Sequence, residues 1–297
     1  MHDRFAFQQS GHLFYPKEGE TLNQNWIVEN LNNAFSTWNG KLTELWGLVT
    51  TGPQSFKGGA VWGVIQNLHN AMVGIGYALV VLFFAISLFK NTMNFHELKR
   101  PEAALHYLIR FVAAKALVGY GMDIMLNIFS ICNGVITDMT SGMGGISQAM
   151  VSLPGEMQTA IENVGFLASI PLWLVTILGS LFITVLSFVM ILTVYGRFFR
   201  LYMYAALAPL PLASFAGEST QSVGISFLKS YIGVCLEGTV IVLACIIYSA
   251  FVSTPTVTGS EPTTMVWSYL AETVFNMLVL VGLVKGSDRI IHEMMGL

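Results

Sequence analysis

Long apolar runs separated by short polar segments make up the pattern from residue 58 to the end of the chain. A helix needs roughly 20 mostly apolar residues to cross the hydrocarbon core of a bilayer. Runs that meet this requirement lie at about 67–89, 170–195, 228–252 and 265–284. A further run at about 104–136 is long enough but contains Arg110, Lys115 and Asp123, so we interpret it as a span with a polar face. The pattern predicts an all-α polytopic membrane protein with about five transmembrane helices.

The first 57 residues have a different pattern, in which polar clusters precede the segment NWIVENLNNAFSTWNGKLTELWGLV. Its apolar residues recur at steps of three and four, which predicts one or two amphipathic helices. These residues are Ile27, Leu31, Phe35, Trp38, Leu42 and Leu45. Because tryptophan prefers the headgroup region, Trp26, Trp38 and Trp46 favour a helix that lies on the membrane surface. The alternative is a helix packed on the membrane domain, which we assign to 58–297.

Composition supports the membrane assignment. Hydrophobic residues make up 54% of the 297 residues, charged residues 10%, and the mean hydropathy is +0.63. Soluble domains average about 25% charged residues, so this chain has too few to cover a water-facing surface. The net charge of -3 comes without a long basic cluster that would suggest nucleic-acid binding. The cysteines Cys132, Cys235 and Cys245 lie in apolar runs, at spacings that fit neither zinc nor a disulfide framework.

The distribution of basic residues predicts the orientation. Short cytoplasmic loops collect lysine and arginine. Loop 90–101 contains three basic residues, whereas loop 137–169 contains acidic residues and no basic one. The first loop is therefore predicted inside and the second outside. This places the amphipathic region 1–57 outside the cell and, with five spans, the C-terminus in the cytoplasm.

The segment 201–215 is apolar but short, and it contains two prolines, Pro209 and Pro211. If it were a complete span, the basic tail would lie outside and loop 253–264, which has no basic residue, would lie inside. We therefore predict a re-entrant or broken helix on the cytoplasmic side, because proline removes a backbone donor and clashes with the preceding turn. A kinked but complete sixth span is the alternative.

Polar residues inside the predicted spans are candidates for function, because charges at bilayer depth are rare. The second span has a polar stripe at steps of four, formed by Lys115, Gly119, Asp123 and Asn127. Counted from the cytoplasmic side, Lys115 and Glu237 lie at similar depths, so we hypothesise that they form an ion pair. The alternative is that Lys115 reaches the headgroups and Glu237 meets asparagine or serine partners.

Arg197 and Arg200 end the third predicted span at the cytoplasmic interface. Basic residues at this position anchor a span, and they can also dock an acidic surface of a cytoplasmic partner. Arg197 and Arg200 can have both roles at once.

Several catalytic signatures are missing from the sequence. The segments HEMMG at 292–296 and HELKR at 96–100 each lack the second histidine of a zinc-protease helix. Neither a nucleophile elbow of the Gly-x-Ser-x-Gly type nor a phosphate loop occurs. We therefore predict a non-enzymatic protein without a cofactor or a bound metal.

One long stretch suggests a family. RFFRLYMYAALAPLPLASFAGESTQSVGISFLKSYIGVCLEG places a basic pair, an Ala-Pro-Leu stretch and a Gly-Glu-Ser-Thr exit between two spans. This arrangement resembles the TrbL-type membrane proteins of conjugative type IV secretion systems, especially those of Gram-positive mobile elements. The resemblance is strongest over about 170–297 and looser over 60–136. By position, the shared cytoplasmic-side segment contains Arg197, Arg200, Pro209, Pro211 and Glu218.

The resemblance implies a subunit of a DNA-transfer machine in the cell membrane. Members of this family have about five spans with the N-terminus outside and assemble as rings of several copies near the secretion ATPases. They support the passage of single-stranded DNA and relaxase. Two alternatives from other functional classes are a secondary transporter or channel for a small solute and a membrane scaffold that conducts nothing.

Overall fold

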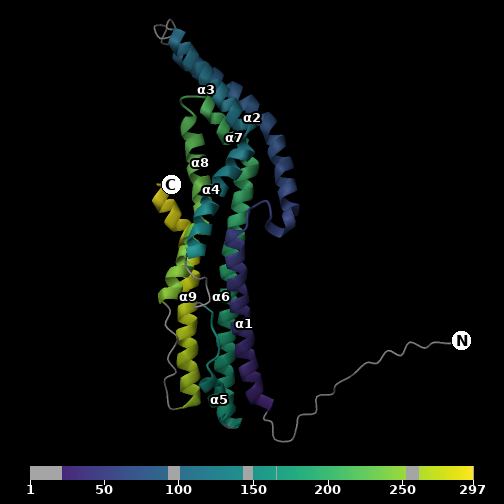
Figure 1. Ribbon diagram of the computed structural model, residues 1–297, viewed down its shortest axis with the longest axis vertical. Helices are drawn as coiled ribbons and strands as arrows, with labels where there is room; N and C mark the ends of the chain where they lie inside the picture. Colours follow the sequence, from purple (N-terminus) through teal and green to yellow (C-terminus); the bar gives the residue numbers. More distant parts are fainter. Residues whose placement is uncertain (1–21, 93–100, 143–149, 165, 252–260, 297) are drawn as a thin grey trace, which may run out of the picture.

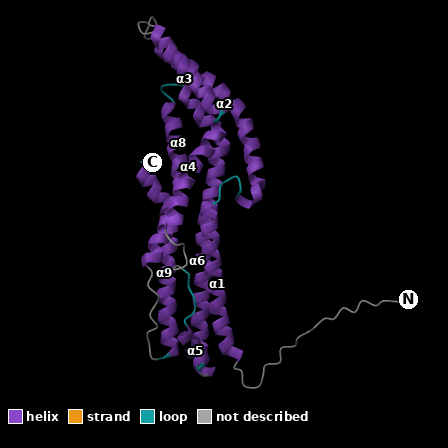
Figure 2. Ribbon diagram, viewed as in Figure 1, coloured by secondary structure: helices purple, strands orange, loops and turns teal. Residues whose placement is uncertain are grey.

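The computed structural model describes residues 22–92, 101–142, 150–164, 166–251 and 261–296. Within these ranges the chain forms helices joined by short turns and no strand (Figures 1 and 2). The predicted all-α architecture is confirmed. Residues 1–21 and most of the loops that carry the orientation argument, at 93–100, 143–149 and 252–260, lie outside the described residues.

The helices form an elongated bundle whose axes run mostly along its length (Figure 1). They are α1 (Leu22–Thr50), α2 (Ala60–Thr92), α3 (Pro101–Gly119), α4 (Gly121–Gly142), α5 (Gly155–Glu162), α6 (Phe166–Leu207), α7 (Pro209–Leu212), α8 (Gln221–Phe251) and α9 (Pro262–Met295). Two 3-10 helices, η1 (Phe56–Gly59) and η3 (Ala213–Ala216), complete the order. Helices α2, α6, α8 and α9 are long and apolar enough to cross a membrane, in agreement with four of the predicted spans.

The second predicted span is broken. Helices α3 and α4 meet at a bend of 72°, and together they count as one further candidate span. Tyr120 lies at the bend between Gly119 and Gly121. Glycine is a poor helix former, so two glycines around one residue weaken the helix there. The chain therefore has four straight candidate spans and a bent fifth.

Helix α6 organises the bundle because its 42 residues are contacted by most of the other long helices. At about 1.5 Å per residue it is about 60 Å long, roughly twice the thickness of a bilayer's hydrocarbon core. Helices α1 and α9 pack along its first part, whereas α2 packs near its end (Figure 1). Only part of α6 can therefore lie in hydrocarbon.

Helix α1 packs against α6 over most of its length. The apolar residues predicted to share one face are buried completely or almost completely: Ile27, Leu31, Phe35, Trp38, Leu42 and Leu45. The amphipathic helix is thus confirmed. Its apolar face is covered by protein, so the structure corresponds to a helix packed on the membrane domain and not to one lying on a membrane surface.

Helix α2 approaches the turn after α6 closely at Gly76. A Cβ atom at this position would lie 2.9 Å from the carbonyl oxygen of Pro209 and 2.9 Å from a methyl group of Val118. A backbone oxygen cannot move aside without shifting the whole turn. Glycine therefore permits this contact between α2, α3 and α7.

We expect Gly76→Val to destabilise the fold by about 1–3 kcal/mol, the usual cost of forcing extra carbon atoms into a packed site. The matched control is Gly74→Val, since Gly74 lies on the exposed side of the same helix, where an added Cβ atom would have nothing within 4 Å. The measurement is the midpoint of heat-induced aggregation of the detergent-purified protein. Equal midpoints for the two variants would contradict the close approach.

Candidate functional site

A cluster of charged side chains lies inside the bundle where α6, α8 and α9 meet. The guanidinium of Arg200 donates to both carboxylate oxygens of Glu237, at 2.6 and 2.7 Å, and also to Asp288. The hydroxyl of Ser287 lies 3.4 Å from Glu237. Glu237 is 1% exposed, so its charge depends on these partners. We call Arg197, Arg200, Glu237 and Asp288 the charge cluster.

Arg197 is the fully buried member of the cluster. Its guanidinium donates to the carbonyl oxygens of Val234 at 3.3 Å and Cys235 at 3.2 Å on α8, and it lies 5.8 Å from the centre of the Phe129 ring on α4. A buried cation is tolerated when oxygen acceptors and an aromatic face replace its water. Arg197 therefore holds α4, α6 and α8 together.

Gly238 makes the room that Arg197 needs. A Cβ atom on Gly238 would lie 2.4 to 2.7 Å from the guanidinium atoms of Arg197. Gly238 directly follows Glu237, so one turn of α8 provides both the carboxylate for Arg200 and the space for Arg197. The two arginines lie three residues apart on α6, which places them on neighbouring positions of one helix side.

The predicted ion pair between Lys115 and Glu237 is not formed. Glu237 pairs with Arg200, and Lys115 is exposed on α3, which packs mainly on α2, α7 and η3. The two residues were matched by depth alone, and depth does not determine which way a side chain faces. The other residues of the predicted stripe, Asp123 and Asn127, are exposed on α4 and are not part of the charge cluster.

Arg197 and Arg200 also differ from the prediction in their position. They were expected at the end of the third span, but α6 continues beyond them to Leu207. Arg197 is fully buried, and the side chain of Arg200 is 29% exposed. Arg197 therefore cannot dock a partner directly, because its donors are directed at carbonyl groups of this chain.

The backbone break lies at the predicted prolines. After Leu207 the chain forms the short helix α7 and the 3-10 turn η3, and α8 then runs back along the bundle. We call Ala208–Ala216 the proline corner. Residues 201–207 are the last turns of α6, so the interruption is shorter than the predicted segment 201–215. Whether the corner re-enters a membrane stays a prediction.

His69 of α2 satisfies a backbone carbonyl that the proline corner leaves open. In a regular helix the N–H of residue 209 would bond to the carbonyl oxygen of Ala205, but Pro209 has no N–H. The Nδ1 atom of His69 lies 2.7 Å from this oxygen, and His69 is buried. Because a carbonyl only accepts, Nδ1 must carry the proton. His69 thus connects α2 to the broken end of α6.

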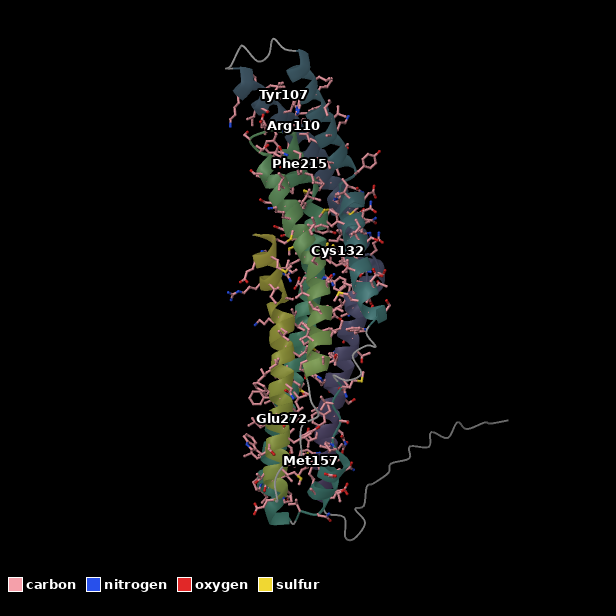
Figure 3. The ribbon with its side chains drawn as sticks, turned by 60° about the vertical axis from the view of Figure 1, so that its left-hand side comes forward. Tyr107, Arg110, Cys132, Met157, Phe215 and Glu272 are labelled. Atoms are coloured by element: carbon pink, nitrogen blue, oxygen red, sulfur yellow. The ribbon has the colours of Figure 1, made fainter. Side chains whose placement is uncertain are left out.

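Glu218 lies just beyond the proline corner. Its carboxylate is 3.8 Å from Arg110 on α3, and Arg110 also donates to Gln221 at 3.2 Å. The Glu218 side chain is 67% exposed, so this ion pair contributes little to stability. Figure 3 shows Arg110 and Phe215 towards the end of the bundle formed by α2 and α3, with Glu272 and Met157 towards the opposite end.

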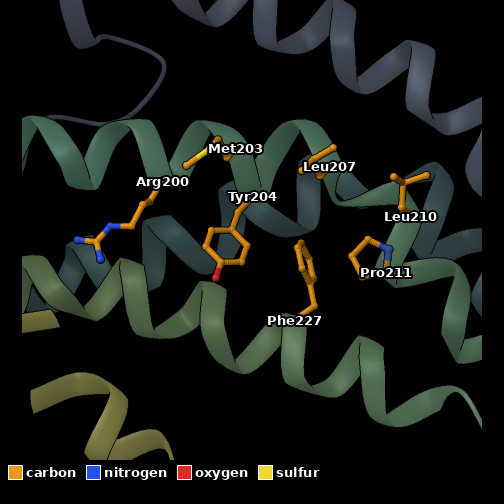
Figure 4. Close-up of a pocket in the computed structure, with 7 residues that line it drawn as sticks. All are labelled: Arg200, Met203, Tyr204, Leu207, Leu210, Pro211 and Phe227. Atoms are coloured by element: carbon orange, nitrogen blue, oxygen red, sulfur yellow. The ribbon is translucent and has the colours of Figure 1, made fainter. Parts of the chain in front are cut away.

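A groove of about 510 Å³ extends from Arg200 along α6 to the proline corner (Figure 4). Its other walls are Met203, Tyr204, Leu207, Leu210, Pro211 and Phe227. This lining is almost entirely apolar and brings together no nucleophile, base or set of metal ligands. Among the described residues, no group of three or more histidine, cysteine, aspartate or glutamate side chains could hold a metal ion.

Three residues of these sites were not predicted from the sequence: His69, Gly238 and Asp288. His69 is the one histidine in the apolar run between Lys57 and Lys90, which was a signal, and Pro209 indicates that a carbonyl group one turn earlier lacks its usual donor. Gly238 and Asp288 carry no such signal, because their roles depend on which helix packs beside them.

A sequence model of the family described as "TrbL/VirB6 plasmid conjugal transfer like protein" matches residues 38–209, more than half of the chain. The matched region begins within α1 and ends at the proline corner. It includes Arg197 and Arg200 but neither Glu237 nor Asp288. It thus lies earlier in the chain than the range 170–297 where the resemblance was expected to be strongest. No curated protein and no solved structure matches the chain significantly.

We expect Glu237→Ala to destabilise the protein by about 3 kcal/mol, because removing one partner of a buried ion pair leaves the other charge without compensation. The exchange of both charges, Arg200→Glu with Glu237→Arg, should recover part of the loss. The readout is thermal aggregation in detergent.

The matched control for this prediction is Arg289→Ala. Arg289 also pairs with a glutamate, Glu293, but both side chains are mostly exposed, at 85% and 66%. Its loss should change stability by less than about 1 kcal/mol. Similar effects of Glu237→Ala and Arg289→Ala would show that the charge cluster does not stabilise the bundle.

We expect His69→Phe to be clearly more destabilising than His69→Asn. Phenylalanine has no donor for the carbonyl oxygen of Ala205, and a buried unsatisfied carbonyl costs about 1–3 kcal/mol. Asparagine retains an N–H donor at a similar distance from the backbone. The control is Asn70→Ala, an exposed polar position next to it on α2. Equal thermal midpoints for the phenylalanine and asparagine variants would argue against this hydrogen bond.

Proposed function

We propose that this chain supports the passage of DNA and its relaxase across the cell membrane. The chain belongs to the TrbL/VirB6 plasmid conjugal transfer-like family. It is a multi-pass membrane component of a conjugal transfer system of the type IV secretion class. The observation that carries this proposal is the family match, which covers α2, α3, α4 and α6 and the second part of α1. Among the described residues, the charged groups of the cluster hold helices together. This arrangement suits a subunit with a structural role in a larger assembly.

The charge cluster supports a mechanical role. Arg197 and Arg200 tie the last third of α6 to α8 and α9 through charge-assisted hydrogen bonds, and Arg197 also contacts the Phe129 ring on α4. Such bonds are roughly twice as strong as neutral ones. A subunit of a translocation machine has to resist force as substrate and partners move past it, and a bundle connected at its centre meets that requirement.

The same proposal includes the partners and the orientation. We propose that several copies assemble into a ring with other membrane subunits of the system and with its cytoplasmic ATPases. The α2–α3 end and the starts of α1, α6 and α9 lie at opposite ends of the bundle (Figure 1). We propose that the α2–α3 end, with the proline corner, faces the cytoplasm and that the opposite end faces outward. Arg110, Glu218 and Lys229, near or beyond the proline corner, then provide the charged surface on which cytoplasmic subunits dock.

A donor strain that lacks this chain tests the proposal. We expect DNA transfer to fall below detection, while the relaxase still nicks the plasmid origin, because the membrane step comes after DNA processing. Expression of the full chain in trans should restore transfer. Glu237→Ala should lower DNA transfer more than Arg289→Ala does, just as it should lower stability more.

Two results would contradict the proposal. One is normal transfer from the deletion strain, and the other is loss of nicking together with transfer, which would place the protein before the membrane step. Uptake of a small solute by the purified protein in liposomes would instead favour the transporter alternative.

A further inference from the structure

The outer face of α1 is polar from Glu29 to Thr50. The residues that are exposed there at steps of three and four are Glu29, Asn33, Ser36, Gly40, Thr43, Gly47 and Thr50. Within residues 26–50 of α1, Trp26 is the one large apolar side chain that is exposed. The opposite face is the buried stripe that packs on α6. Helix α1 therefore has one face covered by protein and one that suits water.

Helix α1 lies beside the third predicted span and not beyond it. The rings of Trp26 and Trp173 stack at 6.0 Å, the ammonium group of Lys41 lies 5.9 Å from the Phe188 ring, and Tyr195 donates to Glu44 at 3.0 Å. Residues 26 to 44 of α1 are thus level with residues 173 to 195 of α6, and the two helices run in the same direction (Figure 1).

At this level α6 exposes a surface that suits lipid. Its exposed large side chains are all apolar: Leu174, Leu178, Leu181, Phe182, Val185, Phe188 and Leu192. One level of the bundle therefore carries two surfaces of opposite character, an apolar one on α6 and a polar one on α1. Lipid can cover the apolar surface of α6 with little loss of free energy, but it cannot do so for the polar surface of α1.

The polar groups of α1 are not all satisfied within the helix. Thr37 and Thr43 donate to carbonyl oxygens one turn earlier, at 2.8 and 2.9 Å, as hydroxyls in helices commonly do. The side chains of Glu29, Asn32 and Asn33 make no hydrogen bond to another described residue. In hydrocarbon an unsatisfied amide costs several kcal/mol and a carboxylate more. These groups need water.

The polar surface continues into a groove between α1 and α6. This groove has a volume of about 390 Å³, and its polar lining comes from both helices: Asn30, Asn33 and Thr37 from α1, and Ser180 and Thr184 from α6. It provides room for several water molecules with polar partners on both sides.

Helix α4, which contacts α1, has an outer face of mixed character. Its polar or small residues exposed at steps of three and four are Asp123, Asn127, Ser130, Gly134, Thr137 and Ser141. The apolar side chains of Ile131 and Val135 are also exposed, at 72% and 43%. The opposite face is buried through Met125, Phe129, Cys132 and Ile136. The polar stripe that begins in the second predicted span is therefore not directed into the bundle. It faces away from the protein.

We infer that the outer face of α1 borders an aqueous space at the depth of the third predicted span. This makes α1 a helix at membrane depth that hydropathy does not identify as a span. The surface consists of amides, hydroxyls and a few carboxylates, and Lys41 is paired with Glu44. Such a surface has little attraction for a polyanion, since nucleic-acid binding depends on free basic residues.

The inference rests on the proposed function in one step only, namely that the aqueous space is the path of the transferred substrate. A path for DNA that binds it weakly would let it move without being retained. The water-facing assignment itself depends on the polar face and the level of α1, whichever substrate uses the space.

Cysteine accessibility in donor cells with the complete transfer system tests the inference. Ser36→Cys and Thr43→Cys place a thiol on the polar face, and Val185→Cys and Leu192→Cys place one on exposed apolar positions at the same level. The probe is a membrane-impermeant methanethiosulfonate sulfonate, applied to cells and to inverted membrane vesicles. The parent chain, with its three buried cysteines, gives the background.

We expect both polar-face cysteines to react more than about tenfold faster than the two controls, because the reagent needs water and a thiolate. Slow reaction at all four positions would mean that protein covers the polar face, and fast reaction at all four would mean that this level lies outside the membrane. Either result overturns the inference.

DNA transfer after labelling gives a separate readout. If the space is the path, modification of Thr43→Cys by a bulky thiol reagent should lower transfer, with no effect on the parent chain. Fast labelling without any loss of transfer would overturn the assignment of the path while leaving the family-based function intact. Loss of the proposed function would instead appear as normal transfer in the deletion strain.

Discussion

Two arginines one turn apart on the longest helix have to be neutralised or hydrated wherever that helix is enclosed, and the bundle is built around the way this is done. Arg200 meets Glu237 and Asp288, and Arg197 meets carbonyl oxygens of α8 and the ring of Phe129. Each of these contacts requires α4, α8 and α9 to lie in one register against α6. A shift of α8 by one residue would carry Gly238 away from Arg197 and close the space that it occupies.

The proline corner also leaves a buried polar group that another helix has to satisfy. Pro209 ends α6 and leaves the carbonyl group of Ala205 without its usual donor, and His69 supplies one from α2. The same region needs Gly76, because any side chain there would meet the backbone of Pro209. One break in a helix therefore determines two residues on a neighbouring helix that are far from it in sequence.

The polar outer face of α1 changes how the spans are understood. Hydropathy identifies helices that are apolar all round, and α1 fails that criterion because half of its surface is polar. Its contacts with α6 nevertheless place it at the level of an apolar span. A helix with one face on protein and one on water is a stable element at membrane depth wherever water is present.

The sequence by itself determined the helical class, four of the spans, the amphipathic character of α1 and the position of the backbone break. These depend on local properties, namely run length, apolar spacing and the chemistry of proline. The partner of Glu237 and the burial of Arg197 were decided only by tertiary structure. A charge in a helix has a height that can be counted along the chain, but the direction in which it faces depends on the packing of helices more than thirty residues away. That is why Lys115 was matched to Glu237 by depth, whereas the structure brings Arg200 to it.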